Sequence, residues 1–319
     1  NYGKTASDLR RYDEAIAHYD QALTLKPDLA EAWFNKGVAL NELKRYDEAI
    51  AHYDQALGLK FDIDWVFGDL LHTKMKICSW TSLAESLEII SKKVMANEKV
   101  ASPFPLLVLS DAPLLHQQCA KIYAQDRFPL NLALGPLVKR PASQKIRIGY
   151  FSADFYNHAT THLMAHLFEL HDTNKFEVYG FSFGPNILDE VRAKVSKSFF
   201  KFFEVSTASD IEIAMLSREC GIDIGIDLKG HTQDSRTGIF AEGVAPIQIS
   251  YLGYPGTMGA EYIDYIIADR IVIPEETQNF YAEKIIYLPD CYQVNDSKRK
   301  ISEKKFSKNQ LGLPDFGFV

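Results

Sequence analysis

Apolar residues follow two different periods along the chain. Up to about residue 137 they recur at helical spacing, as in "WTSLAESLEIISKKVMANEKV" (80–100) and "PLLHQQCAKIYAQDRF" (113–128). The proline-bounded stretch "SPFPLLVLSDAP" (102–113) is expected to interrupt these helices. From about residue 145 onward, short β-rich apolar runs alternate with helical patterns. The pattern therefore predicts a helical first part and an α/β second part.

The second part contains seven strand-like runs. Helical patterns separate several of them, at about 187–198 and in "DIEIAMLSRECG" (210–221), where Gly221 is expected to end the helix. Uninterrupted apolar strands alternating with helices predict a doubly wound parallel sheet that is covered on both faces. The runs are 145–155, 176–184, 199–206, 222–232, 246–257, 262–269 and 283–289.

An internal repeat dominates the first part. "RYDEAIAHYDQAL" occurs at 11–23 and again, letter for letter, at 45–57, an offset of 34 residues. This is the period of the tetratricopeptide repeat, a pair of antiparallel helices. Gly37 and Ala49 are small enough to let the helices of one unit approach closely, and Tyr53 is expected to fill the gap to the next unit.

Three regions follow from these patterns. We predict tetratricopeptide repeats over 1–61, a helical linker over 62–144 and a Rossmann-like lobe over 145–319. Phe61 stands where the first copy has Pro27, so the array is expected to end there. The chain starts inside a repeat and closes on "LGLPDFGFV" (311–319), which resembles the opening of a further strand. We therefore expect a fragment at both ends.

Composition narrows the classes of function. The net charge of −7 argues against binding to nucleic acid or to an anionic membrane surface. The four cysteines show no C-x-x-C spacing, so buried thiols in a reducing compartment, the cytoplasm, are expected.

Ligands of such a sheet bind at the carboxyl ends of its strands. Three of these ends are rich in polar residues and glycine: 152–162, 228–236 and 252–259. If the strands that precede them are neighbours, the three loops converge on one crevice.

The first loop leads into a helix with His158, His162 and His166 on one face. Ala159 replaces the glutamate of H-E-x-x-H, and no further ligand completes a metal set, so we expect no metal site. His158 precedes Thr160–Thr161, the expected N-cap, and should lie at the helix N-terminus, where an anion is favoured. His162 and His166 are interpreted as packing residues.

The other candidates each have a functional and a structural interpretation. Asp154 could accept a proton or orient a nucleophile, or it could only cap the turn. His231, Thr232 and Arg236 could bind a phosphate or a substrate backbone, or form a polar loop. The glycines at 253, 256 and 259 allow either a tight turn or close approach to a ligand. "DID" (62–64) matches the Asp-x-Asp of metal-using glycosyltransferases, but it lies at the end of the repeats and is discounted.

Taken together, these segments resemble the family 41 glycosyltransferases, which include the O-linked N-acetylglucosamine transferases and the Spindly-type O-fucosyltransferases. The resemblance rests on the repeats, on "CSW" (78–80) and on four longer runs. These are "RIGYFSADFYNHATTHLM", "GIDIGIDLKGHTQDSR", "APIQISYLGYPGTMGAEYIDYIIAD" and "YAEKIIYLPDCYQVND".

The resemblance implies a protein O-glycosyltransferase of the GT-B fold. Such an enzyme transfers a sugar, here most simply N-acetylglucosamine from UDP-GlcNAc, to Ser or Thr with inversion and without a metal or other cofactor. The repeats would recruit the protein acceptor, and the nucleotide sugar would lie between two Rossmann-like lobes.

The resemblance also implies site residues. Asp154 matches an aspartate proposed to help deprotonate the acceptor, and His158 matches the active-site histidine. Asn157 and Thr160 flank this histidine, and Leu252 and Gly253 match the loop that approaches the sugar. With His231, Arg236, Gly256 and Thr257 of the polar and glycine-rich loops, they make up the expected donor- and substrate-binding set.

The family's second lobe, which holds the nucleotide and the diphosphate, would begin at about "GFV" (317–319). The 319-residue chain alone is therefore expected to be inactive. Two alternatives stay open: a repeat protein that only binds a partner, and a two-lobed glycosyltransferase acting on small molecules.

Overall fold

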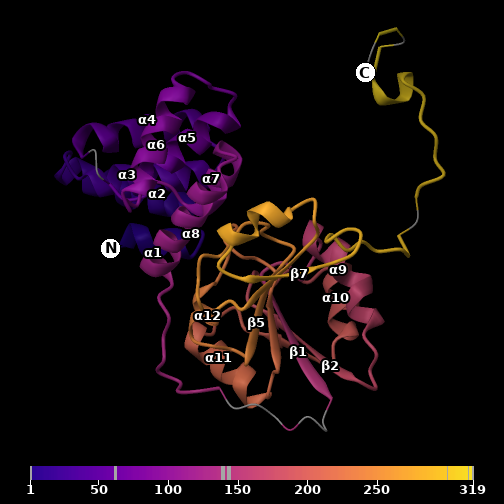
Figure 1. Cartoon of the computed structure of the whole chain (residues 1–319). Helices are drawn as coiled ribbons and strands as arrows, with labels where there is room; N and C mark the ends of the chain where they lie inside the picture. The colour runs from indigo at the N-terminus through magenta and orange to yellow at the C-terminus, as the bar shows by residue number, and fades with distance from the viewer. Residues whose placement is uncertain are drawn as a thin grey trace.

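A computed structural model describes residues 2–60, 63–137, 141, 145–299, 301–314 and 316–317. Helices form one part of the molecule, and a parallel sheet with flanking helices forms the other (Figure 1). The predicted region boundaries at 61/62 and 144/145 fall at residues outside the described set, as do Phe61, Asp62 and the last two residues of "GFV".

The described first part is helical, as predicted, and consists of eight helices. Their lengths and their short connections are those of antiparallel helical pairs. They are α1 (Tyr2–Asp8), α2 (Tyr12–Leu25), α3 (Ala30–Glu42), α4 (Tyr46–Leu59), α5 (Val66–Lys76), α6 (Leu83–Met95), α7 (Pro103–Leu109) and α8 (Pro113–Arg127).

The repeat packing depends on glycine facing tyrosine. A Cβ on Gly37 would lie 2.6 Å from the Tyr53 ring, so α3 and α4 meet closely only because position 37 has no side chain. Gly3 faces Tyr19 in the same way in the first unit. Tyr53 thus packs within its own unit, and it also shares a buried cluster with Val66 and Leu70 of α5. The contact with α5 agrees with the prediction that Tyr53 fills the gap to the following helices, and the contact with Gly37 adds packing within its own unit.

One predicted interruption is a helix. α7 begins at Pro103, and Pro105 also lies in its first turn. Proline is compatible with the first turn because the amide hydrogens there have no partner within the helix. The two prolines therefore begin a helix here.

The sheet has seven parallel strands in the order β3-β2-β1-β4-β5-β6-β7, which confirms the predicted doubly wound fold. Phe151 in β1 is aligned with Asp227 in β4, and Asp227 with Ser250 in β5, so these three strands end at one level. The strand order changes direction between β1 and β4, because β2 and β3 are added on one side of β1 and β4 to β7 on the other. Such sheets bind ligands at this switch point. The strands are β1 (Ile146–Ser152), β2 (Phe176–Ser182), β3 (Lys201–Glu204), β4 (Ile224–Asp227), β5 (Ile247–Tyr251), β6 (Tyr265–Ala268) and β7 (Lys284–Tyr287).

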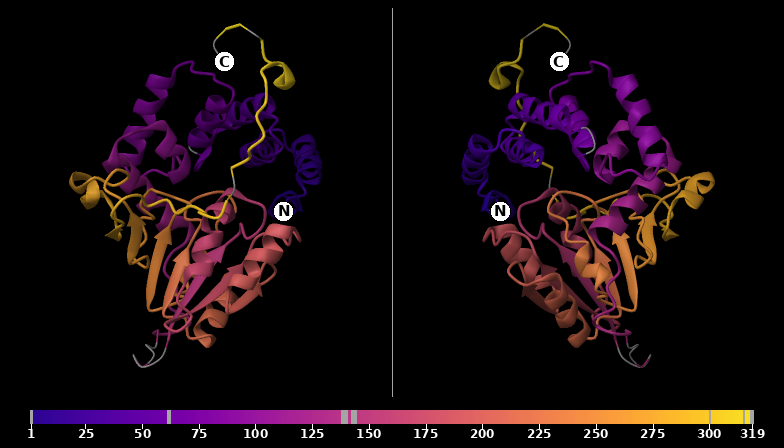
Figure 2. Two further views of the ribbon diagram at one scale, coloured as in Figure 1. Left: turned by 90° about the vertical axis from the view of Figure 1, so that its right-hand side faces the viewer. Right: turned by 90° about the vertical axis from the view of Figure 1, so that its left-hand side faces the viewer.

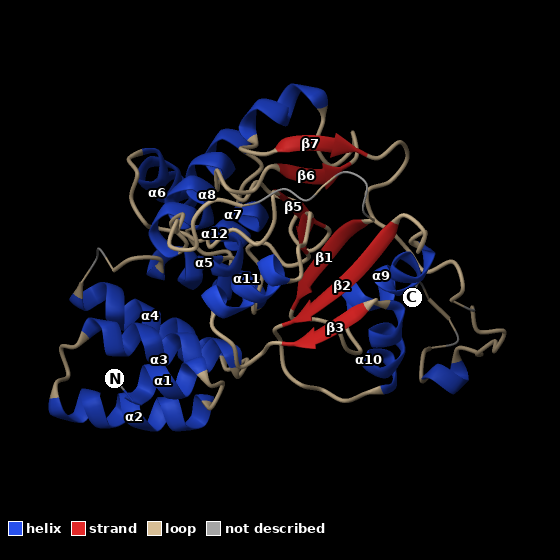
Figure 3. Ribbon diagram, turned by 90° about the horizontal axis from the view of Figure 1, so that it is seen from below, coloured by secondary structure: helices blue, strands red, loops and turns tan. Residues whose placement is uncertain are grey.

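Helices cover both faces of the sheet (Figure 3). On one face, α9 (Ala159–Leu170) and α10 (Glu190–Val195) bury side chains against Tyr150 and Val178. On the other face, α11 (Asp210–Glu219) and α12 (Gly238–Ala241) bury side chains against Phe151 and Phe181. Two apolar layers therefore enclose the sheet, which accounts for its uninterrupted apolar strands.

The helical part lies over the carboxyl ends of the strands (Figure 2). The described segment after α8, up to residue 137, runs down the side of the molecule (Figure 1). From about residue 301 the chain extends away from both parts, with one turn of 3₁₀ helix at Asn309–Leu311.

Cys119 is buried as expected, whereas Cys78 and Cys291 are exposed. Within the described residues, no helix combines the length and the apolar character needed to cross a membrane.

Candidate active site

A cleft of about 700 Å³ separates the helical part from the ends of β1, β4 and β5. The three strands are neighbours in the sheet, which is the condition under which their loops were expected to converge, and the loops meet in this cleft. The opposite wall comes from α3, α5, the start of α7 and α8. The lining residues are Asn41, Glu42, His72, Lys76, Ser102, Pro103, Phe104, Pro105, Tyr123, Asp154, His158, Thr160, Leu228, Lys229, His231, Thr232, Gln233 and Gly253.

His158 is the N-cap of α9, two residues before the start of the expected cap at Thr160–Thr161. Its Nδ1 accepts a hydrogen bond from the Thr160 amide at 3.2 Å. Because an amide nitrogen only donates, Nδ1 is unprotonated in the neutral ring and the hydrogen is on Nε2. The side chain is 37% exposed and lines the cleft. Neutral His158 can therefore donate a hydrogen bond to a ligand.

Asp154 lies beneath His158 in the floor of the cleft, with only 4% of its side chain exposed. Its Oδ2 accepts a hydrogen bond from Lys229 Nζ at 2.8 Å, and it lies 3.5 Å from both Thr160 Oγ1 and His158 Nδ1. The backbone is held as well, since Asp154 N donates to Ser152 Oγ and Asp154 O accepts from Thr161 Oγ1. The carboxylate is thus fixed at the end of β1.

Lys229 was missed by sequence reasoning. Its side chain is 8% exposed, and it reaches from the loop after β4 to the loop after β1. A lysine directly after a buried strand was the available signal, but its partner lies 75 residues away in the sequence. Asp227, which accepts a hydrogen bond from the Lys229 amide, is buried, and burial raises its pKa to about 6.

His231 lies deep in the same loop, edge-on to the rings of Tyr123 and Tyr254 at centroid distances of 5.2 and 5.3 Å. Its Nε2 lies 2.9 Å from the Met258 carbonyl oxygen, which can only accept, so Nε2 carries the hydrogen. Burial lowers the pKa of His231 to about 4, and the ring is neutral near pH 7. Nδ1 has no hydrogen-bond partner within the described part of the chain.

Residues of the loop after β5 line two separate hollows. Gly253 borders the cleft, and a Cβ there would lie 2.1 Å from the Leu228 carbonyl oxygen. Gly256 and Thr257 instead line a separate hollow of about 270 Å³ beside α7 and α8. The carboxylate of Glu283 holds this loop, accepting from Thr257 Oγ1 at 2.8 Å and from the Met258 amide at 2.6 Å.

Three other predicted residues lie outside the cleft lining. Arg236 pairs with Asp210 and donates to the Ala208 carbonyl at 2.8 Å. The backbone N–H of Asn157 donates to Asp189 at 2.7 Å, and its side-chain Oδ1 contacts His162. Leu252 has a φ of 68°, in the left-handed region, so the chain turns at this residue between the end of β5 and Gly253.

The other histidines of α9 were expected to pack. His162 is exposed, with Nε2 2.7 Å from Asn157 Oδ1, so the packing interpretation was wrong for it. His166 is partly buried and contacts Ser297 at 2.9 Å.

The helical part contacts the site loop directly. Gln233 Nε2 donates to Glu42 Oε2 at 2.8 Å, and Arg10 forms an ion pair with Asp234. Burial raises the pKa of Glu42. These contacts hold the repeats beside the cleft, and Asn41 and Glu42 of α3 line it.

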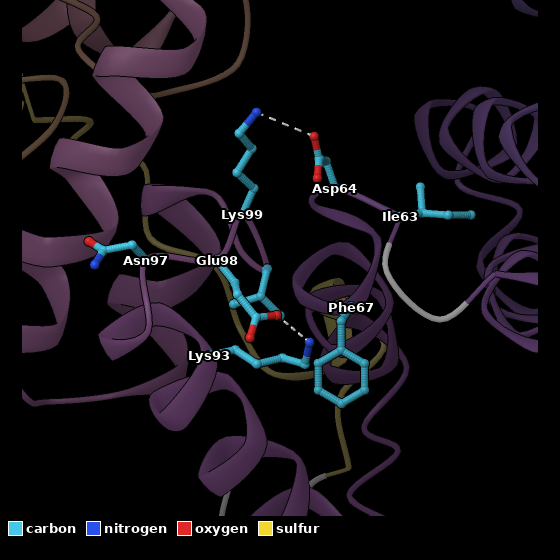
Figure 4. A pocket seen from close by; sticks show the side chains of 8 residues that line it. Ile63, Asp64, Phe67, Lys93, Asn97, Glu98 and Lys99 are labelled. Atoms are coloured by element: carbon cyan, nitrogen blue, oxygen red, sulfur yellow. Dashed lines mark hydrogen bonds and ion pairs between the residues drawn. The ribbon is translucent and has the colours of Figure 1, made fainter.

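A further hollow, of about 320 Å³, lies among the helices near α5 and α6 (Figure 4). Its charged side chains are already paired: Lys93 with Glu98, and Lys99 with Asp64 at 3.6 Å. Asp64 belongs to the discounted Asp-x-Asp stretch, and its pairing argues against a metal role for that stretch. Among the described residues, no cluster of three or more His, Cys, Asp or Glu could hold a metal ion.

Comparison with known proteins gives the family. A sequence profile described as "Glycosyl transferase family 41" matches residues 132–309, which include every loop residue of the cleft. The chain belongs to glycosyl transferase family 41. A tetratricopeptide profile matches residues 3–62 of this family 41 chain.

Curated relatives agree with this assignment. The chain is 35% identical over 270 residues to "Probable UDP-N-acetylglucosamine--peptide N-acetylglucosaminyltransferase SEC" of Arabidopsis thaliana, covering 78% of the chain and 28% of the relative. It is 34% identical over 190 residues to a Caenorhabditis elegans peptide N-acetylglucosaminyltransferase, covering 59% and 15%. The family 41 chain thus spans less than a third of either relative.

A solved structure shares the fold. A mutant of the O-GlcNAc transferase of Thermobaculum terrenum superposes with a TM-score of 0.67 at 23% identity, covering 91% of this chain and 56% of that one.

Proposed function

We propose that this family 41 chain carries the acceptor side of the active site of a protein O-GlcNAc transferase. The enzyme would transfer N-acetylglucosamine from UDP-GlcNAc to Ser or Thr with inversion and without a metal. The observation that carries the proposal is the position of Asp154, His158 and Gly253 in one cleft that opens toward the tetratricopeptide helices. The names of the curated relatives support the choice of donor.

The geometry divides the chemistry between two side chains. In an inverting transfer the acceptor oxygen forms a bond to the anomeric carbon, the bond to the diphosphate breaks with its electron pair, and the hydroxyl proton must be accepted. Neutral His158 offers Nε2–H and is suited to donate to an oxygen of the ligand. The ionised carboxylate of Asp154 can only accept, so it is the proton acceptor of the pair, directly or through a water molecule.

We propose that the acceptor polypeptide reaches this pair along the repeats. The contacts of Gln233 with Glu42 and of Arg10 with Asp234 hold the repeat helices beside the cleft. Helical arrays of this kind present concave surfaces to polypeptides. The leaving diphosphate would be bound by a second lobe, and the 319-residue chain alone would then be inactive.

The test uses the full-length protein with UDP-GlcNAc or GDP-fucose and a protein extract as acceptor. Mass spectrometry should find N-acetylhexosamine on Ser or Thr with UDP-GlcNAc, at an unchanged rate in EDTA. Transfer of fucose alone would overturn the choice of donor, and loss of activity in EDTA would overturn the metal-free mechanism. Absence of transfer from either donor would favour a repeat protein that only binds partners.

Calorimetric titration of UDP into the 319-residue chain tests the placement of the nucleotide. No binding is expected if a second lobe holds UDP. Micromolar binding would show that this lobe contains the nucleotide site.

A further inference from the structure

Lys229 places a buried positive charge in the floor of the cleft. Its Nζ lies 2.8 Å from Asp154 Oδ2, and the exposed fractions of the two side chains are 8% and 4%. The pair joins the loop after β4 to the loop after β1, the two neighbouring strands between which the strand order changes direction.

The backbone around Lys229 is fixed on both sides. Its amide donates to Asp227 Oδ1 at 2.8 Å, and its carbonyl accepts from Thr232 Oγ1 at 2.9 Å. Gly230, the next residue, has a φ of +55°, and a Cβ there would lie 2.5 Å from Tyr254 Cβ. This turn cannot easily be rearranged, so the direction of the lysine side chain is set by the fold.

The other contacts of the carboxylate are weaker. Thr160 Oγ1 and His158 Nδ1 both lie 3.5 Å from Oδ2, at the limit of a hydrogen bond. His158 Nδ1 also accepts from the Thr160 amide, so in the neutral ring it has no hydrogen to offer Asp154. Of the contacts described for the Asp154 carboxylate, the one to Lys229 is therefore the shortest, and it joins opposite charges.

A buried ion pair is weak evidence for stability, because desolvation of the two charges offsets their attraction. Removal of one partner is costly, since it leaves the other charge buried without a counterion. A pair in this position is explained better by what it does for the carboxylate than by what it adds to folding.

We propose that Lys229 is a positioning residue that keeps Asp154 ionised and directed at the acceptor hydroxyl. This inference rests on the proposed function, because it assigns Asp154 the role of proton acceptor. In this proposal Lys229 contacts the carboxylate of Asp154, whereas Asp154 and His158 contact the reacting atoms.

The test measures transfer by four variants of the full-length protein: Lys229→Met, Lys229→Arg, Asp154→Asn and Asp154→Asn with Lys229→Met. Lys229→Met should lower kcat by about 100-fold while the KM for UDP-GlcNAc changes less than about threefold. Lys229→Arg keeps the charge and should recover at least about tenfold of that loss. In the Asp154→Asn background, Lys229→Met should change kcat by less than about twofold, because its target is already neutral.

The matched control is Arg147→Met. Arg147 lies at the amino end of β1, the strand whose other end leads to Asp154; it pairs with Glu177 at 2.7 Å and does not line the cleft. Its kcat should equal that of the wild type. If Lys229→Met alone does not fold, the neutral double variant and Asp154→Asn still provide the comparison.

Two results would overturn the inference: a wild-type kcat for Lys229→Met, or a further loss of tenfold or more when Lys229→Met is added to Asp154→Asn. The second result would mean that the lysine acts on the ligand itself. Failure of the proposed function is distinguishable, because the wild type itself would then transfer no sugar. In that case crystal structures decide: the Asp154 carboxylate should turn away from the cleft in Lys229→Met, and an unmoved carboxylate would refute the positioning role.

Discussion

Substitution of Gly253 by alanine tests the junction between the loops after β4 and β5. The added Cβ would lie 2.1 Å from the Leu228 carbonyl oxygen and 3.2 Å from the Lys229 Cα. Real Cβ atoms stay beyond about 3 Å, so one of the two backbones must move by about 1 Å. Either movement displaces Lys229 or the rim of the cleft.

The expected magnitudes differ for stability and for activity. Overpacking of this kind costs about 1–3 kcal/mol of unfolding free energy, which leaves a domain of ordinary stability folded at 25 °C. A displacement of about 1 Å next to reacting groups can cost on the order of 100-fold in rate. Gly253→Ala should therefore lose far more activity than stability.

Urea denaturation and transfer kinetics on the full-length protein measure the two effects. The control is Gly58→Ala, at an exposed helical position where a Cβ would meet nothing within 4 Å. It should keep wild-type kinetics and gain up to about 1 kcal/mol from helix propensity. Wild-type transfer by a folded Gly253→Ala would refute the reasoning, because it would show that the two loops can separate without effect on the site.

Three further predictions concern packing and pH. Gly37→Ala should lower the unfolding free energy by about 1–3 kcal/mol, because its Cβ would lie 2.6 Å from the Tyr53 ring; unchanged urea denaturation would contradict the packing of α3 on α4. Burial lowers the pKa of His231 from 6.5 to about 4, so the unfolded chain binds a proton first and stability falls as the pH drops from 6.5 to 4. Relative to His231→Gln, the wild type should lose up to about 3 kcal/mol over that window, and parallel pH–stability curves would show that His231 is not the group responsible. Glu283→Gln replaces the carboxylate that accepts from the Met258 amide and the Thr257 hydroxyl by a neutral side-chain amide, and should lower the unfolding free energy by about 1–3 kcal/mol, measured by thermal unfolding. A decrease below about 0.5 kcal/mol would contradict the role of Glu283 in holding the loop.

The course of the chain was predictable from sequence because it depends on local patterns. Each apolar run from 145 to 289 contains one strand of the parallel sheet, and the exact repeat identified the paired helices. Parallel strands end at one edge, so the loops after β1, β4 and β5 could be expected to converge if these strands were neighbours; the structure supplies that order. The prediction that the prolines at 103 and 105 interrupt the helices was wrong, because the effect of proline depends on whether it lies in the first turn or in the interior of a helix.

The direction of individual side chains was less predictable. Lys229 and Asp154 meet across 75 residues, and Arg236, only seven residues after Lys229, turns instead to Asp210. Gly253 and Thr257, four residues apart, line different hollows. Such differences depend on turn geometry and on long-range partners, which residue spacing does not encode. The wall contributed by Glu42, Lys76 and Tyr123 depends on how the repeats and the linker helices pack against the sheet, and no sequence motif predicts it.

The central claim is that the cleft over β1, β4 and β5 is the site of sugar transfer. Its most direct test is the transfer rate of full-length His158→Ala, compared with His166→Ala. Both histidines are on α9, but His158 lines the cleft and His166 contacts Ser297 outside it. We predict that His158→Ala loses at least about 100-fold in kcat/KM for the acceptor, whereas His166→Ala stays within about twofold of the wild type. Normal transfer by a folded His158→Ala would contradict the account.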